Sequence, residues 1–118
     1  MFRTSREGRN ASGTERDIVA RKVRVTGRVQ GVGYRYWAAS RAEELALRGY
    51  VRNLTDGSVE ALLIGEPMDV ARMLALCSEG PLDAVVARVE TSPPEPSDKL
   101  DLQGFRRAAT GDPGSPPR

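Results

Sequence analysis

The spacing of apolar residues changes in a fixed order along this chain, and that order restricts the possible folds more than any other feature. Residues 22–26 alternate between apolar and charged side chains, which predicts a half-buried strand. From residue 34 to residue 47, apolar side chains recur every three or four positions, which predicts an amphipathic helix. Gly49 marks the end of this helix, since glycine commonly follows the last helical turn.

The middle of the chain contains two further strand patterns and a second helix. Residues 50–53 and 58–64 are predicted to form a hairpin, joined by a Thr-Asp-Gly turn at 55–57. Pro67 begins the next helix, because proline suits the first helical turn, and Gly80 ends it. The apolar face of this helix is Val70, Met73, Leu74 and Cys77.

A fourth strand and a fragment of a fifth complete the pattern. The valine-rich residues 84–91 are predicted to form a strand, and the three prolines of residues 92–101 predict a loop. Phe105 marks a short last strand. The side chains expected on one face of the fourth strand are Val85, Ala87 and Val89.

This order of elements indicates the fold class. Strand, helix, strand, strand, helix, strand is the split β-α-β arrangement, in which each helix crosses one face of the sheet. We therefore expect an α+β ferredoxin-like (βαββαβ) sandwich, with a four- to five-stranded antiparallel sheet and two helices on one face. Because this fold hosts many functions, the activity has to be inferred from particular residues.

Both ends of the 118-residue chain differ in composition from the middle. Residues 1–20 are rich in charge and poor in apolar side chains, and they contain no apolar run typical of a signal peptide. Residues 110–118 contain three prolines. We therefore expect one domain at residues 21–109, with disordered tails at residues 1–20 and 110–118.

The composition excludes several classes of site. There is no histidine, so a histidine-based triad is impossible and the commonest metal ligand is missing. Cys77 is the only cysteine, which excludes an intramolecular disulfide; it is expected to be a small buried hydrophobe. With 18 basic and 16 acidic residues, the near-balanced charge does not require nucleic acid, and no apolar run is long enough to span a membrane.

A glycine-rich segment joins the first strand to the first helix. It reads Gly-Arg-Val-Gln-Gly-Val-Gly-Tyr-Arg, from Gly27 to Arg35. Glycines allow close approach of the backbone, so that successive amides can converge on one anion near the positive end of the helix dipole. Arg35 adds a permanent charge that matches two phosphate oxygens at once. The segment therefore predicts a phosphate-binding loop, although an ordinary strand-to-helix turn could contain the same glycines.

A second segment, Gly-Tyr-Val-Arg-Asn at residues 49–53, follows directly after the first helix. Together the two segments resemble the acylphosphatase family. Its signatures are a Gly-Arg-Val-Gln-Gly-Val-x-aromatic-Arg loop and a Gly-aromatic-Val-basic-Asn segment before a glycine-containing turn, in this order and spacing. The resemblance runs from about residue 23 to about residue 107. It implies a small hydrolase of carboxyl-phosphate anhydrides that uses no metal and no cofactor.

The resemblance also implies roles for particular residues. The signature arginine, Arg35, binds the phosphate, the loop amides complete the cradle, and the signature asparagine, Asn53, positions the attacking water. Arg35 and Asn53 are thus the expected catalytic residues. The expected phosphate-binding residues are Gln30, Gly31, Val32, Gly33, Tyr34 and Arg35.

The chemistry of an acyl phosphate suits such a site. The leaving group is a carboxylate of low basicity, so no general acid is required. Positioning and electrostatic stabilisation can then supply most of the rate, and the phosphate of the substrate can take the proton from water. The expected partners are a small acyl phosphate and inorganic phosphate, with no nucleic acid and no membrane. We expect a cytoplasmic monomer.

Several residues have a plain structural explanation beside the functional one. Asn53 could be a turn residue, and Asp56 could belong to the hairpin turn or to a metal site. Arg28 and Arg52 could draw in the anion or be solvated strand charges. Ser58 could hydrogen-bond near Asn53. Three aromatic residues are expected to pack the first helix: Tyr34, Tyr36 and Trp37.

The chain departs from the family pattern at three places. Ala46 stands where a glycine often ends the first helix, so the helix either continues to Gly49 or places Ala46 in a conformation that costs roughly 1 kcal/mol. Gly33 replaces a larger residue in the cradle, and residues 106–109 continue into a tail.

Two other functions would use the same fold. A non-catalytic phosphate-binding or regulatory module needs the cradle but no asparagine, and an RNA-binding sheet needs exposed aromatic pairs that the central strands lack.

Overall fold

The computed structural model describes residues 17–117, so most of the predicted N-terminal tail lies outside the described residues. Five strands form one sheet in the order β4-β1-β3-β2-β5. The first strand begins within the segment predicted as tail. The elements are β1 (Val19–Arg28), α1 (Tyr34–Glu44), β2 (Arg48–Asn53), β3 (Val59–Gly65), α2 (Pro67–Cys77), β4 (Val85–Ser92) and β5 (Phe105–Arg107).

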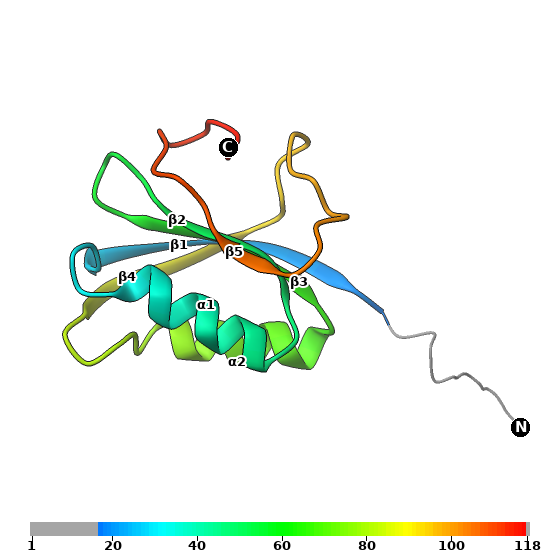
Figure 1. The fold of residues 1–118 in the computed structure, drawn as a ribbon, viewed down its shortest axis with the longest axis horizontal. Coiled ribbons are helices and arrows are strands. Elements are labelled where there is room, and N and C mark those ends of the chain that lie inside the picture. The colour runs from blue at the N-terminus through cyan, green and yellow to red at the C-terminus, as the bar shows by residue number, and fades with distance from the viewer. Residues whose placement is uncertain (1–16, 118) are drawn as a thin grey trace, which may run out of the picture.

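The predicted βαββαβ order is confirmed, with one correction to the sheet. Strands β1 to β4 pair antiparallel, whereas β5 pairs parallel with β2, so the sheet is mixed. The chain leaves β4 at one edge, crosses the sheet through residues 93–104 and returns at the opposite edge, beside β2 (Figure 1). This crossing brings β5 in with the same direction as β2. Sequence spacing does not show that reversal.

Both helices cover the same face of the sheet, as predicted (Figure 1). Their buried side chains meet the inward-facing residues of β1, β2 and β3 in one apolar core. The residues of α1 that enter this core are Tyr34, Ala38 and Ala42, and those of α2 are Val70, Met73 and Cys77. No helix within residues 17–117 is long and apolar enough to cross a membrane.

A β-bulge changes which side chains of β4 face the core. Thr26 pairs with Arg88 and Gly27 pairs with Val86, so Ala87 is an extra residue in the ladder. Val86 and Val89 consequently pack against the core, whereas Val85 is 62% exposed. The predicted face of Val85, Ala87 and Val89 is therefore wrong, since a bulge interrupts the period of two. Gly27 has φ +125° there, a conformation available to glycine.

Helix α1 ends in a Schellman motif that contains an alanine where glycine is usual. The amide of Leu47 donates to the carbonyl of Ala42 at 2.9 Å, and the amide of Ala46 donates to the carbonyl of Glu43 at 3.0 Å. Ala46 has φ +57° and is the only non-glycine residue with positive φ among the described residues. The helix thus stops at Glu44, and the strained alternative expected for Ala46 is the one observed.

The other face of the sheet carries buried charged groups beneath residues 93–104 and the C-terminal residues. Arg52 is 1% exposed, and its Nε donates to Oε1 of Glu60 at 2.8 Å. The hydroxyl of Tyr50 donates to the same oxygen at 3.1 Å. Lys22 reaches Asp98 of the crossing loop at 2.9 Å. These buried charges are all paired, as burial requires.

The C-terminal residues extend the β2 edge of the sheet. Gly111 forms a parallel bridge with Leu54, and its amide donates to the carbonyl of Asn53 at 3.1 Å. The amide of Thr55 donates to the carbonyl of Gly111 at 2.9 Å. Where the sequence predicted a disordered tail at residues 110–118, the structure pairs Gly111 with the end of β2 and bonds Asp112 to Thr55 of the hairpin turn. The bonds of Gly111 satisfy backbone groups that an open edge would leave unpaired.

Candidate active site

The loop from β1 to α1 presents a series of free backbone amides. Gly31 and Gly33 adopt φ +74° and +80°, and Gly33 is the N-cap of α1 without a side-chain cap. Within residues 17–117, none of the amides from Gly31 to Tyr36 donates a hydrogen bond to a protein acceptor. Unpaired amides at a helix N-terminus, beside the positive end of its dipole, favour an anion.

Arg35 lies in the first turn of α1 and is half-buried. Its Nη1 is 3.4 Å from the carbonyl oxygen of Ala108, just after β5. No carboxylate of the described chain pairs with it, in contrast to Arg24 and Arg52, which pair with Asp56 and Glu60. The guanidinium therefore keeps most of its hydrogen-bonding capacity for a ligand.

Asn53 is the last residue of β2, where it pairs with Val59. Its backbone is fixed from both sides, because the amide of Gly111 also donates to its carbonyl oxygen. Its side chain is half-buried, and the carboxamide makes no hydrogen bond with any residue between 17 and 117. A carboxamide so placed has a free acceptor and two free donors.

One pocket, of about 200 Å³, brings these groups together. It contains Arg35 and Asn53 and no acidic residue. Its full lining is Val29, Gly31, Gly33, Tyr34, Arg35, Tyr36, Asn53 and Arg107. Segments separated in sequence by the whole of α1 thus meet over one concave surface that is positively charged.

Comparison with known proteins assigns the chain and its fold to one family. The family model described as acylphosphatase matches residues 21–107. An acylphosphatase of Rhodopseudomonas palustris is 51% identical over 75 residues, which are 60% of this chain and 76% of the relative. An acylphosphatase of Acidiphilium cryptum is 43% identical over 95 residues, which are 80% of this chain and all of the relative.

The chain belongs to the acylphosphatase family. A solved structure supports the same assignment: that of an acylphosphatase from Coxiella burnetii, with a TM-score of 0.69 and 34% sequence identity. The alignment covers 76% of this chain and 92% of that one.

Two of the residues predicted to bind phosphate, Gln30 and Val32, do not line the pocket. The side-chain amide of Gln30 turns away and donates to the carbonyls of Leu54 and Ser58, each at 2.8 Å. It thereby ties the loop to the hairpin turn that follows Asn53. Val32 is half-buried against the core. The side chain of Gln30 is thus placed to hold the two signature segments in register.

Three residues of the pocket were not among the predicted binding residues: Val29, Tyr36 and Arg107. Tyr36 was expected to pack the helix, but it is 66% exposed, and the guanidinium of Arg107 lies 5.1 Å from its ring centroid. Only Tyr34 and Trp37 pack as expected, edge to face at 5.3 Å. Arg107 reaches the pocket because β5 pairs parallel with β2, which sets Arg107 opposite Val51, two residues before Asn53; no sequence pattern shows this pairing.

The buried hydroxyl of Tyr34 donates to the carbonyl of Cys77 at 2.6 Å, which joins the two helices. Burial raises the pKa of Tyr34 above its ordinary value, and burial likewise raises the pKa of Cys77 to about 11. Both groups are therefore neutral at neutral pH, and Cys77 is the buried thiol expected from the sequence.

Other candidate residues belong to the hairpin turn or to the opposite face. Asp56 accepts from the hydroxyl of Ser58 at 2.6 Å and pairs with Arg24, so it stabilises the turn. Ser58 bonds Asp56 and not Asn53. Arg52 points away from the pocket, and Arg28 does not line it. Among residues 17–117, no group of three His, Cys, Asp or Glu side chains could hold a metal ion.

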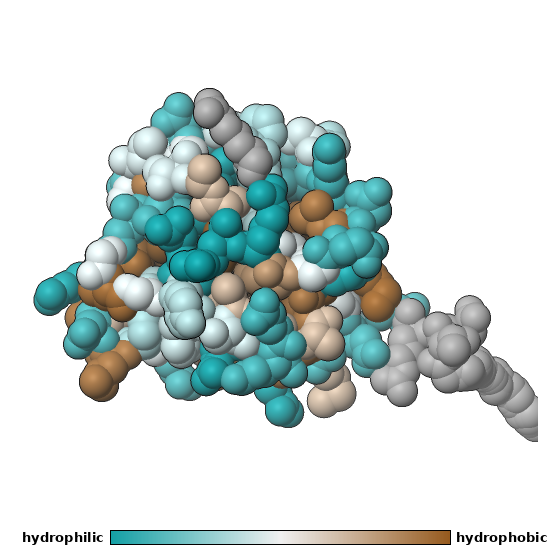
Figure 2. Space-filling view, viewed as in Figure 1, coloured by the Kyte–Doolittle hydropathy of each residue, from teal (hydrophilic) through white to brown (hydrophobic). Residues whose placement is uncertain are grey.

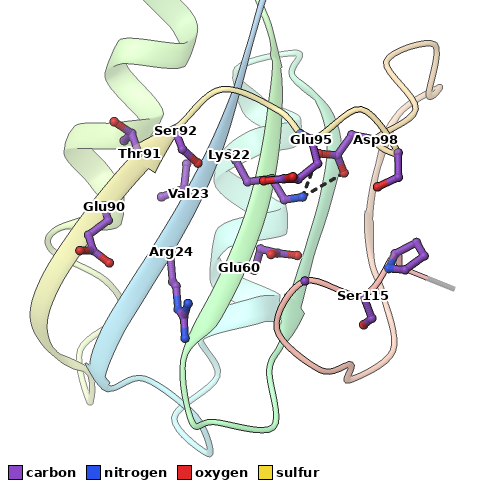
Figure 3. A pocket seen from close by; sticks show the side chains of 13 residues that line it. Lys22, Val23, Arg24, Glu60, Glu90, Thr91, Ser92, Glu95, Asp98 and Ser115 are labelled. Carbon is purple, nitrogen blue, oxygen red and sulfur yellow. Dashed lines mark hydrogen bonds and ion pairs between the residues drawn. The ribbon is translucent and has the colours of Figure 1, made fainter.

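A larger hollow, of about 380 Å³, lies on the opposite face of the sheet. Figure 3 shows the side chains of Lys22 and Glu60 converging there, with Asp98 bonded to Lys22. Its charges have both signs and are largely paired within the protein. It contains neither Arg35 nor Asn53. The smaller pocket at the start of α1 is therefore the candidate active site.

Proposed function

We propose that this chain hydrolyses the carboxyl-phosphate anhydride bond of small acyl phosphates, giving a carboxylate and inorganic phosphate. The observation that carries the proposal is the shared pocket of Arg35, Asn53 and the free amides at the start of α1. Membership of the acylphosphatase family supports the same reaction. The proposal also assigns a role to each group.

Arg35 and the loop amides bind the phosphoryl group. The amides supply donors that need no reorganisation, and the guanidinium can contact two equatorial oxygens. No carboxylate lines the pocket, so a phosphate dianion meets no repulsion there. In a loose transition state, negative charge is spread over the equatorial phosphoryl oxygens. The fixed donors of the amides and of Arg35 stabilise that charge.

Asn53 positions the attacking water. Its carboxamide oxygen can accept from a water molecule whose own oxygen faces phosphorus, opposite the departing carboxylate. The water oxygen forms the new bond to phosphorus as the bond to the acyl oxygen breaks. The electron pair of that bond leaves with the carboxylate, and the proton of water passes to a phosphoryl oxygen. No side chain has to change its protonation state.

The weakly basic leaving group needs no general acid, and the proposed chemistry uses no metal. We place the whole site for the acyl phosphate within one chain, since Arg35, Asn53 and the loop amides all come from the same chain. We place the reaction in the cytoplasm, which the single buried thiol suits.

The experiment is a turnover assay with benzoyl phosphate, run with and without a chelator. We expect turnover that is unaffected by chelator or added magnesium, and inhibition by inorganic phosphate. Arg35→Gln should weaken phosphate inhibition and lower kcat/KM together, while Arg35→Lys should restore part of both. Arg72→Gln, with the same charge change on α2, should match the wild type. Absence of turnover, or a metal requirement, would refute the proposal.

A further inference from the structure

A second hollow adjoins the candidate active site along α1 and β5. It has a volume of about 320 Å³ and shares Tyr36 and Arg107 with the phosphate-binding pocket. Its other lining residues are Ala39, Ser40, Glu43, Phe105 and Arg106. We call it the α1/β5 groove. A substrate whose phosphate occupies the pocket can thus extend past Tyr36 and Arg107 into this groove.

Arg107 is held at the junction of the two hollows by an aromatic ring. It is the last residue of β5, and its guanidinium lies over the exposed ring of Tyr36. Stacking on a ring restrains an arginine without using its hydrogen-bond donors. Within residues 17–117 Arg107 has no carboxylate partner, whereas Arg41 and Arg88 pair with Glu44 and Glu90.

The charge along this path is mostly positive. Arg35 lies in the pocket and Arg107 at the junction, against the single carboxylate of Glu43 in the groove, while Arg106 also lines a hollow on the opposite face of the sheet. Figure 2 shows strongly hydrophilic side chains gathered over β5, next to α1. Arg107 lines both hollows, and its guanidinium donors have no hydrogen-bond partner among the described residues. These donors are therefore available to a group on the acyl side of the substrate.

We propose that the α1/β5 groove receives the acyl group and that Arg107 selects acyl phosphates with a second anionic group on that side. The inference rests on the function proposed above and specifies its substrate class. A carboxylate or phosphate on the acyl chain would accept a charge-assisted hydrogen bond from Arg107, which Tyr36 holds in place. Arg107 thus contributes to substrate binding. The step that breaks the anhydride bond is the same for every substrate.

A matched pair of substrates tests the inference: benzoyl phosphate and 4-carboxybenzoyl phosphate. They share a ring and a leaving group of similar basicity, and differ in one remote carboxylate. In the wild type, kcat/KM should be higher for the carboxylated substrate, mainly through KM. Arg107→Gln should reduce this preference about five- to tenfold, the range expected of one charge-assisted bond at a partly exposed site.

Further variants separate the possible causes. Arg107→Lys should keep part of the preference, and Tyr36→Leu should lose part of it, because the guanidinium is no longer restrained. Arg72→Gln carries the same change in net charge away from the groove, so it should keep the wild-type ratio. Higher salt should reduce the preference in the wild type, since exposed charges are screened.

Three results would overturn one or both of the proposals. If the wild type hydrolyses benzoyl phosphate and Arg107→Gln leaves the substrate ratio unchanged, the function stands and the role of Arg107 is wrong. If Arg107→Gln weakens inhibition by inorganic phosphate as strongly as Arg35→Gln does, Arg107 belongs to the phosphate cradle and not to acyl recognition. If the wild type hydrolyses neither substrate, both proposals fail.

Discussion

Replacing Ala46 by glycine should stabilise this protein, although it deletes a methyl group. Ala46 occupies the C′ position of a Schellman motif with φ +57°. An L-residue with a Cβ pays about 1–2 kcal/mol in that left-handed conformation, and glycine does not. Glycine makes the unfolded chain more flexible, which returns about 0.4–1 kcal/mol. The side chain is exposed, so no burial is lost. The net gain is about 0.5–1 kcal/mol.

The assay is unfolding in urea and by heat. A gain of this size raises the thermal midpoint of a domain this small by a few degrees, about 2–6 °C. Ala71→Gly is the matched control, because Ala71 is also exposed but lies in the regular part of α2. That variant should lose about 0.5–1 kcal/mol. If Ala46→Gly is destabilising by the same amount as Ala71→Gly, the left-handed helix end is wrong.

Two further predictions concern stability. Gln30→Ala removes both side-chain bonds to the hairpin turn, and each carbonyl keeps one backbone donor. The free energy of unfolding in urea should therefore fall by about 1–2 kcal/mol. Turnover should also fall, because the loop is no longer tied to the hairpin, whereas Ala71→Gly, which is destabilised away from the pocket, should keep its turnover. The second is alkaline destabilisation. Burial raises the pKa of Cys77 from 9.0 to about 11, so the neutral thiol stabilises the fold fully below pH 9, and this stabilisation is lost as pH rises towards 11. A plot of the urea midpoint against pH should therefore fall in this range for the wild type and fall less for Cys77→Ala. Identical plots for the two proteins would contradict the prediction.

Most of the fold could be predicted because local signals and tertiary structure agree. Alternation in β1, helical spacing in α1 and α2, and the Thr-Asp-Gly turn each specify an element and its neighbours. The failures have physical causes. The face of β4 depends on a bulge opposite Gly27, and the parallel pairing of β5 depends on where a proline-rich loop crosses the sheet. Neither leaves a periodic pattern in the sequence.

Some residues of the candidate site could likewise be predicted from the sequence, and others could not. Arg35 and Asn53 stand in local motifs, so their sequence context alone suggests a shared pocket. Arg107 and Tyr36 could not be identified in this way, because their contact joins β5 to α1 across about 70 residues. Gln30 was assigned to the phosphate cradle, whereas its side chain bonds the hairpin turn. Motif membership does not reveal which way a side chain points.

The most direct test of the proposed mechanism is to compare turnover and phosphate binding in Asn53→Ala. The account predicts that kcat for benzoyl phosphate falls about a hundredfold or more, as expected for loss of one positioned group. The Kd of inorganic phosphate, measured by calorimetry, should stay within about twofold, because Arg35 and the loop amides are intact, and circular dichroism should match the wild type. Unchanged turnover, or equal losses in turnover and phosphate affinity, would contradict the assignment of Asn53 to the water.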